Sequence, residues 1–411
     1  MTNLPHSDSR HVNRTYLYRL YPSRAQERVL FAWFWRCCEI YNAALQERQE
    51  AWRKQRVSIS RIDQEKQVPV IRAERHEFES IPVAVLRGVL RRLDRAFTAF
   101  FRRCKSGEKP GFPRYRAARR WRTIEIDDLK KNPIVSGGKR VQIPLMGLVK
   151  FKQHRPLEGR PKVMRIVLKN GRWYVAITCT GVAPKPLPAT GKFVGVAVGL
   201  THFAVTSDGQ FFENPRPLDS ARLCLERAQR RVTRRKNLKS QRRRRAACLL
   251  ARHHERVANI RRENCIRVAR ALVQQFDRII VEDINIPALL RDHPERARAI
   301  LDAGWATFIY WLYVKAESAG REVTKVNPAW TSCTCSECGW RGPRLPLTTR
   351  MFVCGSCGFS CDRDLNAARN ILRLGTSPRG AAHQRRSAKS AANGGPGHAR
   401  PLVTRIARSG S

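Results

Sequence analysis

The sequence predicts an α+β fold that is divided among several domains. The chain has 411 residues, which at about 150 residues per domain suggests two or three of them. Strand-like runs dominate the stretch before a proline-rich segment at 182–192, and strands alternate with long helices after it. Two Cys-x-x-Cys pairs follow near the C-terminus, where they predict a small module built around a metal ion.

The first half begins with a strand and continues with helices. RTYLYRLY at 14–21 alternates as a strand does, and apolar residues recur at helical spacing over 25–41. A second apolar stripe, flanked by arginines, predicts a helix at 82–104. Asn170-Gly171 is a strong signal for a two-residue hairpin turn between two strands. Strands are expected at 140–144, 147–152, 162–169 and 172–180.

The second half opens after the linker at 182–192. FVGVAVGL and HFAVTSDG are typical of buried strands. Residues 219–275 predict two helices broken near 237–240, and they carry the cationic tract RRVTRRKNLKSQRRRRAA. DRIIVEDINI predicts a strand that ends in acids, followed by a helix at 296–319 and a strand at 322–326. From residue 376 onward the composition turns to Ser, Arg, Gly, Ala and Pro without periodicity, which predicts a disordered basic tail over 376–411.

The net charge of the chain limits the classes of function that it can have. Lys and Arg total 80 against 33 Asp and Glu, a formal net charge of +47. A charge this large repels itself on folding, which disfavours an ordinary metabolic enzyme and predicts a polyanionic partner, with nucleic acid ahead of an anionic membrane. No apolar run reaches the roughly 18 residues of a membrane span, and the N-terminus lacks the apolar stretch of a secretory signal. We therefore expect a cytoplasmic protein that associates with the nucleoid when it binds DNA.

The cysteine pairs are the sharpest motif in the chain. Fifteen residues separate the two pairs, a spacing typical of a four-cysteine zinc ribbon. A glycine follows each pair, Gly339 and Gly358, where a metal-binding turn needs a relaxed backbone. Four thiolates close the coordination shell, so zinc here is expected to be structural. Cys333 and Cys361 lie just outside the pairs, and the paired spacing favours the inner four over them. The predicted ligands are Cys335, Cys338, Cys354 and Cys357.

Acidic residues at two places in the second half can converge on Mg²⁺. Glu282 and Asp283 end the apolar run RIIV, and Asp364 lies at the predicted start of the helix DRDLNAARNIL. Two-metal nucleases need carboxylates arranged in this way. Residue type alone favours a blander interpretation, in which Asp362 or Asp364 caps the helix and the acids after RIIV face solvent.

Taken in order, these motifs resemble a known family. GVAVGL, VEDIN, the two cysteine pairs and DRDLNAARNIL are similar to the RuvC nuclease domain of the TnpB (OrfB) proteins of bacterial insertion sequences. YRLYPSRAQE, YNAALQER, RRLDRAFTAFF and GEKPGFPRY resemble their N-terminal half, so the resemblance covers about residues 14–375. It implies a transposon-associated, RNA-guided DNA endonuclease that is related to the compact type V CRISPR effectors.

The resemblance also implies a domain layout and partners. A wedge β-barrel at 1–181 holds an inserted helical recognition region at about 25–125. After the linker come an RNase H-like (RuvC) α/β domain at 193–332, a zinc ribbon at 333–361 and a final RuvC helix at 362–375. The implied partners are a guide RNA from the transposon end and double-stranded target DNA. The protein reads a short motif beside the target while base pairing reads the rest.

One residue departs from the family's catalytic Asp–Glu–Asp set. Glu282 matches the glutamate and Asp364 the last aspartate, but Ala197 stands at the first aspartate position in GVAVG. A methyl group cannot coordinate Mg²⁺, so cleavage by two-metal hydrolysis should fall by orders of magnitude. Asp208, in the turn Ser-Asp-Gly, is more readily a turn former than a substitute.

Ala197 has two explanations. It is either a substitution introduced to inactivate the enzyme or a feature of a natural relative that binds DNA under RNA guidance and represses. The intact Glu282 and Asp364 favour the first, because drift after natural loss tends to erode all three acids. A basic protein that coats RNA or DNA without a guide is a further alternative. We expect the basic helices at 219–275 and the first domain to contact RNA, with Phe112, Tyr115 and Trp121 either stacking on bases or packing in the core.

Overall fold

The computed structural model describes residues 12–377 except 128, 130, 131, 136, 138, 238, 239, 347 and 348. The chain forms two compact units that divide between Pro184 and Lys185. The expected tail at 376–411 lies outside the described residues from position 378 onward. Among the described helices, none has the length and apolar character needed to cross a membrane.

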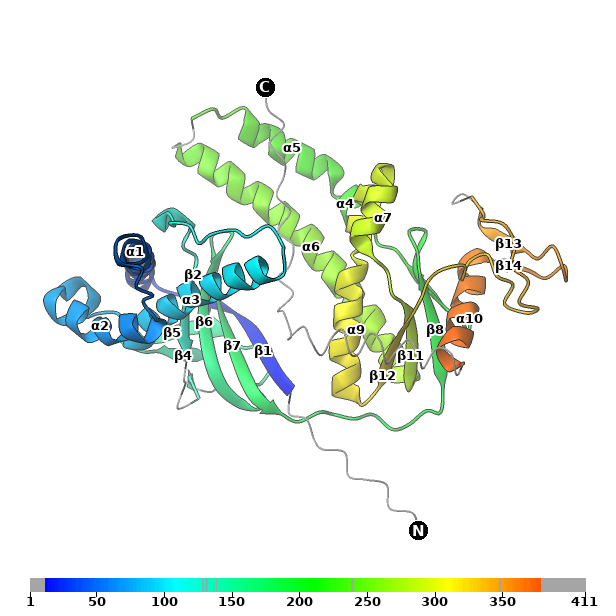
Figure 1. The fold of residues 1–411 in the computed structure, drawn as a ribbon, viewed down its shortest axis with the longest axis horizontal. Coiled ribbons are helices and arrows are strands. Elements are labelled where there is room, and N and C mark those ends of the chain that lie inside the picture. The colour runs from blue at the N-terminus through cyan, green and yellow to red at the C-terminus, as the bar shows by residue number, and fades with distance from the viewer. Residues whose placement is uncertain are drawn as a thin grey trace, which may run out of the picture. The chain divides into compact units, whose positions relative to one another are not determined.

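The first unit is built on a seven-stranded antiparallel sheet (Figure 1). Its order is β2-β6-β7-β1-β5-β4-β3, so the N-terminal strand β1 lies between β5 and β7. The hairpin predicted at Asn170-Gly171 is confirmed, because both residues take the positive φ angles, 51° and 71°, that a two-residue turn needs. The strands are β1 (Val12–Tyr21), β2 (Thr123–Asp127), β3 (Ile134–Val135), β4 (Arg140–Ile143), β5 (Gly147–Lys152), β6 (Arg160–Lys169) and β7 (Arg172–Val182).

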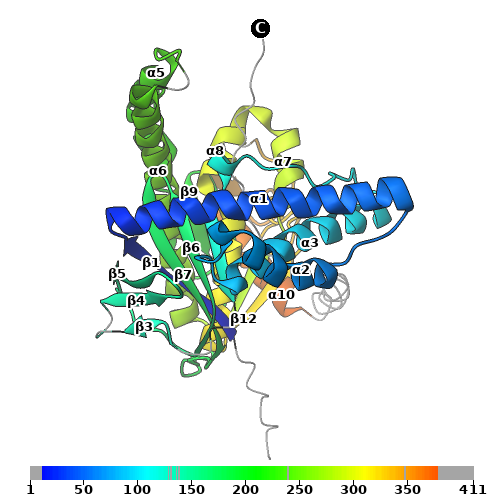
Figure 2. The same ribbon diagram turned by 90° about the vertical axis from the view of Figure 1, so that its left-hand side faces the viewer.

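Three helices accompany this sheet: α1 (Arg24–Gln55), α2 (Arg61–Glu74) and α3 (Val83–Lys105). Figure 2 shows the length of α1, and α3 packs against both α1 and α2. Ser23 starts α1 through a capping box with Gln26, in which each side chain bonds the other's backbone N–H. Helix α2 was not predicted from the sequence. This helix contains Pro69 and buries only Gln64 and Val68, so it lacks the apolar stripe that marks α1 and α3. Two short 3₁₀ turns, His76–Phe78 and Ala118–Arg120, complete the unit.

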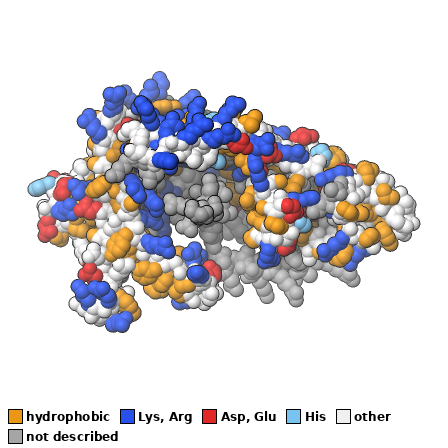
Figure 3. Space-filling model, turned by 90° about the horizontal axis from the view of Figure 1, so that it is seen from above, with side chains coloured by type: hydrophobic (Ala, Val, Ile, Leu, Met, Phe, Trp, Pro, Cys, Tyr) orange, Lys and Arg blue, Asp and Glu red, His pale blue; other side chains and the backbone are white. Residues whose placement is uncertain are grey.

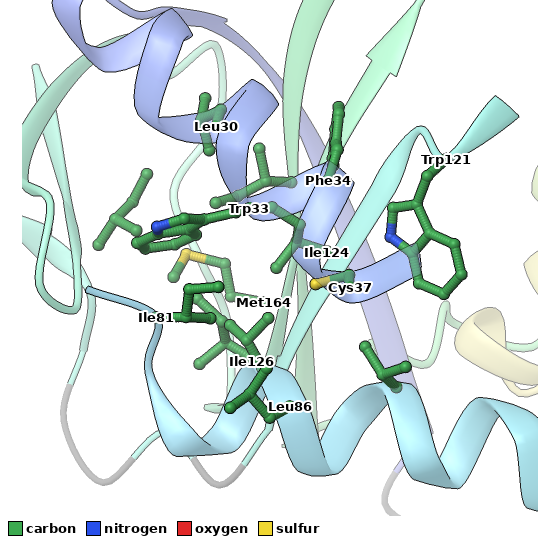
Figure 4. Close-up of a cluster of buried hydrophobic side chains, with 14 of the residues drawn as sticks. Leu30, Trp33, Phe34, Cys37, Ile81, Leu86, Trp121, Ile124, Ile126 and Met164 are labelled. Atoms are coloured by element: carbon green, nitrogen blue, oxygen red, sulfur yellow. The ribbon is translucent and has the colours of Figure 1, made fainter. Parts of the chain in front are cut away.

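The core of the first unit lies between the helices and one face of the sheet. Figure 4 shows side chains of α1, including Leu30, Trp33 and Phe34, packed with apolar side chains of β2 and β6. Trp121 belongs to this core, with only 3% of its surface exposed and the Arg92 guanidinium 4.6 Å from its ring centroid. The interpretation of Trp121 as a base-stacking residue is therefore wrong. Phe112 and Tyr115 are 46% and 54% exposed.

The second unit contains a mixed five-stranded sheet in the order β10-β9-β8-β11-β12. Strands β8, β11 and β12 run parallel, with β12 at one edge, and β9 and β10 extend the sheet on the other side as antiparallel neighbours. A separate hairpin of β13 and β14 carries the second cysteine pair between its strands. The strands are β8 (Phe193–Val198), β9 (His202–Thr206), β10 (Phe211–Glu213), β11 (Arg278–Glu282), β12 (Glu322–Val326), β13 (Met351–Val353) and β14 (Ser360–Asp362).

Helices cover both faces of this five-stranded sheet (Figure 1). Val194, Val196 and neighbouring side chains of β11 face α6 and α9, while Ala197 and Ile280 face α10. This alternation follows from the two-residue period of a strand. The helices are α4 (Pro217–Ser220), α5 (Arg222–Thr233), α6 (Gln241–Gln275), α7 (Ile286–Asp292), α8 (Ala297–Ala303), α9 (Trp305–Ala319) and α10 (Arg363–Thr376), with a 3₁₀ turn at Pro294–Arg296.

Two helical predictions have different outcomes. The break expected near 237–240 is confirmed, because α5 ends at Thr233 and α6 begins at Gln241. The single helix expected at 296–319 is instead the pair α8 and α9. Gly304 separates them with a left-handed φ of 72°, a conformation that glycine adopts without steric cost.

Candidate functional site: two carboxylates beside a buried alanine, and a four-cysteine cluster

The parallel pairing of β8 and β11 brings two of the predicted site residues to one edge of the sheet. Val196 and Val281 are partners in the register, so Ala197 and Glu282 are the next residues along the two neighbouring strands. Carboxyl ends of parallel strands are a common location for ligand sites in α/β folds. Glu282 is also the partner of Val326 on β12.

Glycines allow α10 to lie directly on these strands and so place Asp364. A Cβ atom at Gly195 would lie 2.1 Å from the carbonyl oxygen of Ala368, and one at Gly375 would lie 2.5 Å from the Ile280 side chain. Neither position has room for a side chain. A Cβ atom at Gly199 would lie 3.2 Å from Asp364 Oδ2, which puts the Asp364 carboxylate beside the end of β8.

Two of the four acids considered for the site, Asp362 and Asp283, have other roles in the structure. Asp362 is the N-cap of α10, and its side chain accepts hydrogen bonds from the backbone N–H of Asp364 (2.8 Å) and Leu365 (3.1 Å). Asp283 forms an ion pair with Lys325 at 2.9 Å. The Asp364 carboxylate is therefore not needed as a cap, and it lies 3.9 Å from Arg350 Nη1.

The ionisation of Glu282 and of Asp364 is disfavoured in this structure. Desolvation is the largest cause that raises the pKa of Glu282 to about 7; the negative charge of Asp364 adds to the rise, and a hydrogen bond from Thr331 Oγ1 at 3.4 Å opposes it. The pKa of Asp364 is also raised, first by desolvation and then by Asp362, while Arg350 and His202 oppose the rise. A bound cation would lower the free-energy cost of ionising two carboxyl groups in such a place.

Ala197, on the strand next to Glu282, makes apolar contacts. It is 4% exposed, and its neighbours in the cluster are Ile280, Val326, Ala367, Ala368 and Ile371. The acids nearest to it are Glu282 and Asp364, and carboxylate oxygen is a ligand type that Mg²⁺ uses. They are too few to hold a metal pair. Within the described part of the chain, the only group of three or more Cys, His, Asp or Glu residues close enough to share an ion is the set of four cysteines.

The four cysteines predicted as zinc ligands do come together. Their sulfur atoms all lie within 4.8 Å of one another, with 3.8 Å between Cys335 and Cys357 and 3.6 Å between Cys338 and Cys354. Tetrahedral coordination with Zn–S bonds of about 2.3 Å places sulfur atoms about 3.8 Å apart, so the cluster fits Zn²⁺. Cys333 and Cys361 are outside this set.

The backbone of each cysteine pair supports this arrangement. Gly339 and Gly358 have φ angles of 79° and 71°, which confirms the expected relaxed turns. The backbone N–H groups of Ser356 and Cys357 point at the Cys354 sulfur from 3.4 Å and 3.5 Å. Hydrogen bonds from backbone N–H groups to sulfur stabilise a thiolate, which is the form in which cysteine binds a metal.

Two asparagines that were not predicted as site residues connect α10 to the segment that leads into the first cysteine pair. Asn366 accepts a hydrogen bond from Ser336 N–H at 2.9 Å and donates one to the Thr334 carbonyl at 2.7 Å. Asn370, one helical turn later, donates to the carbonyls of Thr331 (2.9 Å) and Thr334 (2.6 Å). Both asparagines are buried. Their spacing of four residues on the apolar face of DLNAARNIL was the available signal, since a buried amide needs partners.

Arginines are concentrated on the hairpin of α5 and α6. Figure 3 shows Lys and Arg side chains gathered densely along the upper edge of the view, where they outnumber Asp and Glu. The cationic tract runs from the end of α5 through the connecting segment to the start of α6. Its exposed members within the described residues include Arg230, Arg231, Arg234, Lys236, Arg242, Arg244 and Arg245.

Three protein families match parts of the chain. Residues 176–292 match the OrfB_IS605 family, described as a probable transposase, and residues 305–371 match the TNB domain of Cas12f1-like proteins. Residues 12–56 match a helix-turn-helix domain of the OrfB_IS605 group. In this structure that last segment holds the strand β1 and the single long helix α1 rather than two helices.

Individual relatives extend these matches over nearly the whole chain. A protein described as a "Putative RNA-guided DNA endonuclease" from Streptomyces pristinaespiralis is 30% identical over 374 residues, which cover 89% of this chain and 90% of the relative. InsQ from Escherichia coli K12, described in the same words, is 27% identical over 318 residues, with 72% and 75% covered. The "CRISPR-associated DNA-binding protein Cas12m" of Allomeiothermus silvanus is 34% identical over 120 residues, which cover 28% of this chain and 22% of that protein.

The fold is also similar to a solved structure. In the Cas12f1–sgRNA–target DNA complex, the matching chain superposes with a TM-score of 0.54 at 14% identity, covering 90% of this chain and 99% of that one. The sequence motifs, the mixed α/β units, the cysteine cluster and the relatives agree with one another. The chain belongs to the TnpB (OrfB) family, which is related to the type V CRISPR effectors.

Proposed function

We propose that this chain is an RNA-guided DNA-binding protein of nuclease lineage that binds guide-matched DNA but does not cut it. Its relatives over most of the chain are described as RNA-guided DNA endonucleases, and the matching solved structure is a complex with guide RNA and target DNA. The observation that carries the proposal is the buried, apolar Ala197 beside Glu282 and Asp364. An intact member of this lineage would cleave double-stranded DNA next to a short flanking motif by two-metal hydrolysis.

The second unit is proposed to be the RuvC-like, RNase H-like nuclease domain. Glu282 and Asp364 would hold Mg²⁺, which when bound stabilises charge on the phosphodiester oxygens. Thr331 orients Glu282 through its hydroxyl, and Asp362 fixes the start of the helix that carries Asp364. Without a carboxylate at position 197, the two acids lack the partner that would keep a metal pair in place.

The zinc ribbon is proposed to have a supporting role. Four thiolates complete the coordination of Zn²⁺ and leave no position for a substrate. Asn366 and Asn370 on α10 donate hydrogen bonds to Thr334, inside the ribbon, and to Thr331, just before it. The folded ribbon and the position of Asp364 would therefore depend on each other.

The first unit is proposed to be the wedge barrel with an inserted helical recognition region, and its sheet offers an RNA-binding face. Lys152, Arg19 and Tyr174 are cross-strand partners on β5, β1 and β7, and the Arg19 guanidinium lies 5.5 Å and 5.2 Å from the ring centroids of Tyr21 and Tyr174. Like charges directly opposite each other destabilise a sheet, and a phosphate backbone removes that repulsion. The basic hairpin of α5 and α6 would supply a second phosphate-binding surface.

If Ala197 is natural and was not introduced, the chain has a second candidate function, that of a natural nuclease-dead repressor. The close apolar fit of Ala197 and the relative described as a DNA-binding protein favour it, whereas the two intact acids favour an introduced change. Both candidates predict the same behaviour for this chain, namely guided binding without cutting.

Copurified RNA tests the proposal. The full chain is expressed with the DNA that flanks it, the bound RNA is sequenced, and binding to matched and scrambled duplexes is compared in Mg²⁺. We expect one discrete, structured RNA and selective binding of the matched duplex without cleavage. Heterogeneous RNA fragments with equal affinity for both duplexes would instead support a protein that coats nucleic acid without a guide.

A further inference from the structure

The segment between β7 and β8 is rich in proline and extended. Proline stands at every second position from Pro184 to Pro188, where it fixes φ near −65° and removes a backbone N–H donor. The segment contains neither helix nor strand and runs as an extended stretch into β8 (Figure 1). The residues between and after the prolines therefore supply its backbone donors, and the partners of these donors show to which unit the segment is bound.

The donors between the prolines bind the end of α9. Lys185 N–H donates to the carbonyl of Ser318 at 2.8 Å. Leu187 N–H, two residues later, donates to the carbonyl of Ala319 at 3.0 Å. Carbonyl groups in the last turn of a helix lack partners within the helix, so the segment satisfies groups that α9 leaves open. Gly320 ends α9, and a Cβ atom there would lie 3.3 Å from a proline of the segment.

A buried ion pair holds the other end of the segment. The carboxylate of Asp277, which lies just before β11, accepts hydrogen bonds from the N–H groups of Thr190 (2.9 Å) and Gly191 (2.7 Å). Arg321 Nη1 donates to Asp277 Oδ1 at 2.5 Å, and its Nη2 donates to the carbonyl of Pro188 at 2.8 Å. The Arg321 side chain is only 3% exposed. Because a charge buried in this way is costly to leave without its partner, the ion pair keeps the segment in place.

The first unit holds the chain up to the residue where the segment begins. Val182, the last residue of β7, pairs with Val12 on β1 and is 1% exposed. Only Ala183 and Pro184 then separate β7 from the first residue bound to α9, and neither makes a hydrogen bond within the described part of the chain. The proline has a fixed φ, and it restricts the residue before it to extended conformations. The connection is therefore short and has little freedom of its own.

We propose that residues 185–192, which we call the strap, are a fixed part of the second unit, so that the two units pivot about Ala183 and Pro184 alone. The inference rests on the proposed function in one respect, because it takes a guide RNA as the ligand that contacts both units. Once the RNA has bound the sheet of the first unit, a short connection keeps the basic hairpin of α5 and α6 at a high effective concentration. The strap thus gives a long linking segment the reach of a very short tether.

Amide hydrogen exchange tests the strap without any nucleic acid. Mass spectrometry of residues 183–193 in the full chain should show slow exchange at the strap amides, because they are hydrogen-bonded to the second unit. Asp277→Asn/Arg321→Gln removes both charges of the ion pair together and should speed this exchange. The matched control Asp283→Asn/Lys325→Gln removes an ion pair at the other end of the same strands and should leave it unchanged.

Inserts at the pivot test the length of the connection. Gly-Ser segments of ten and twenty residues are placed between Ala183 and Pro184, outside both folded units, so the melting temperature should not change. Effective concentration falls roughly as the −3/2 power of linker length. If Ala183 and Pro184 alone connect the units, guide RNA affinity should fall about 15-fold and about 36-fold. A flexible linker over all of 183–192 would give only about 3-fold and about 5-fold.

The outcomes separate this inference from the proposed function. Slow exchange at the strap together with the steep loss of RNA affinity supports the inference. Strap amides that exchange as fast as in the denatured chain refute it, and so does the shallow loss of about 3-fold and about 5-fold. If the unmodified chain retains no discrete RNA, the proposed function fails, whereas slow exchange at the strap would still support its place in the second unit.

Discussion

Replacing Ala197 with aspartate should make the stability of the second unit depend on Mg²⁺. The substitution puts a third carboxylate into a position that is 4% exposed and next to Glu282 and Asp364. Burial and the neighbouring charge raise the pKa of Glu282 from its ordinary 4.5 to about 7. Each pKa unit corresponds to about 1.4 kcal/mol, so ionising a carboxyl group here costs about 3 kcal/mol. We expect a similar cost for the new aspartate at neutral pH without metal.

Mg²⁺ should reverse most of this loss. At a concentration 100 times its dissociation constant, a ligand stabilises the folded state by about 2.7 kcal/mol. In a unit of this size, about 1 kcal/mol shifts the melting temperature by about 2–4 °C. The variant should therefore melt about 6–12 °C below the parent in EDTA and recover most of that difference in Mg²⁺, whereas the parent should respond weakly.

The isosteric Ala197→Asn variant serves as the control, because it adds the same bulk without the charge. It should be destabilised but should gain little from Mg²⁺. Scanning calorimetry with and without Mg²⁺ measures both effects. If Ala197→Asp and Ala197→Asn respond alike to the ion, the three positions do not form a shared metal site and the reasoning is refuted.

Three further predictions concern the supports of the site. Glu282→Gln should flatten the pH dependence of stability. Because the pKa of Glu282 is raised in the folded chain, its contribution to stability is present below about pH 4.5 and is lost as the pH rises through 7. Urea denaturation at pH 5 and pH 8 measures this, and an equally steep pH dependence in the variant would contradict it. Gly195→Ala should lower the free energy of unfolding by about 1–3 kcal/mol or more, since its Cβ would lie 2.1 Å from the α10 backbone. Gly199→Ala should lower it less, because the contacts there would be 3.0 Å or longer. Equal denaturation midpoints for the two variants would contradict the packing argument. Removing zinc, by chelation or by Cys338→Ser, should increase hydrogen exchange across residues 349–377, which mass spectrometry can measure. Unchanged exchange after loss of the metal would show that the ribbon does not support α10.

Much of the fold could be predicted because its local signals are strong. The hairpin at Asn170-Gly171 has one favoured turn geometry, and the break before Gln241 follows a run without apolar periodicity. Helix α2 was missed because it buries few residues and contains Pro69. The division of 296–319 at Gly304 was missed because a single glycine inside a helical pattern is often tolerated.

The candidate site, too, could be predicted only in part from the sequence. Spacing was enough to bring the four cysteines together, since a pair separated by two residues forms one half of a tetrahedral site. Sequence could not tell which of Asp362 and Asp364 caps α10, because both lie at the helix start and only the backbone geometry selects one. Nor could it show that Thr331 reaches Glu282, since that contact joins residues 49 positions apart.

Guided cleavage by the Ala197→Asp variant tests the central claim most directly. With the copurified guide RNA, a matched duplex and Mg²⁺, the account predicts that Ala197→Asp cuts the DNA. The parent chain should bind the duplex and leave it whole, as should Ala197→Asp combined with Glu282→Gln. Cutting by the parent at the same rate as Ala197→Asp, or full guided binding by Ala197→Asp with no cutting at all, would contradict the claim that a missing carboxylate at position 197 is what disables this site.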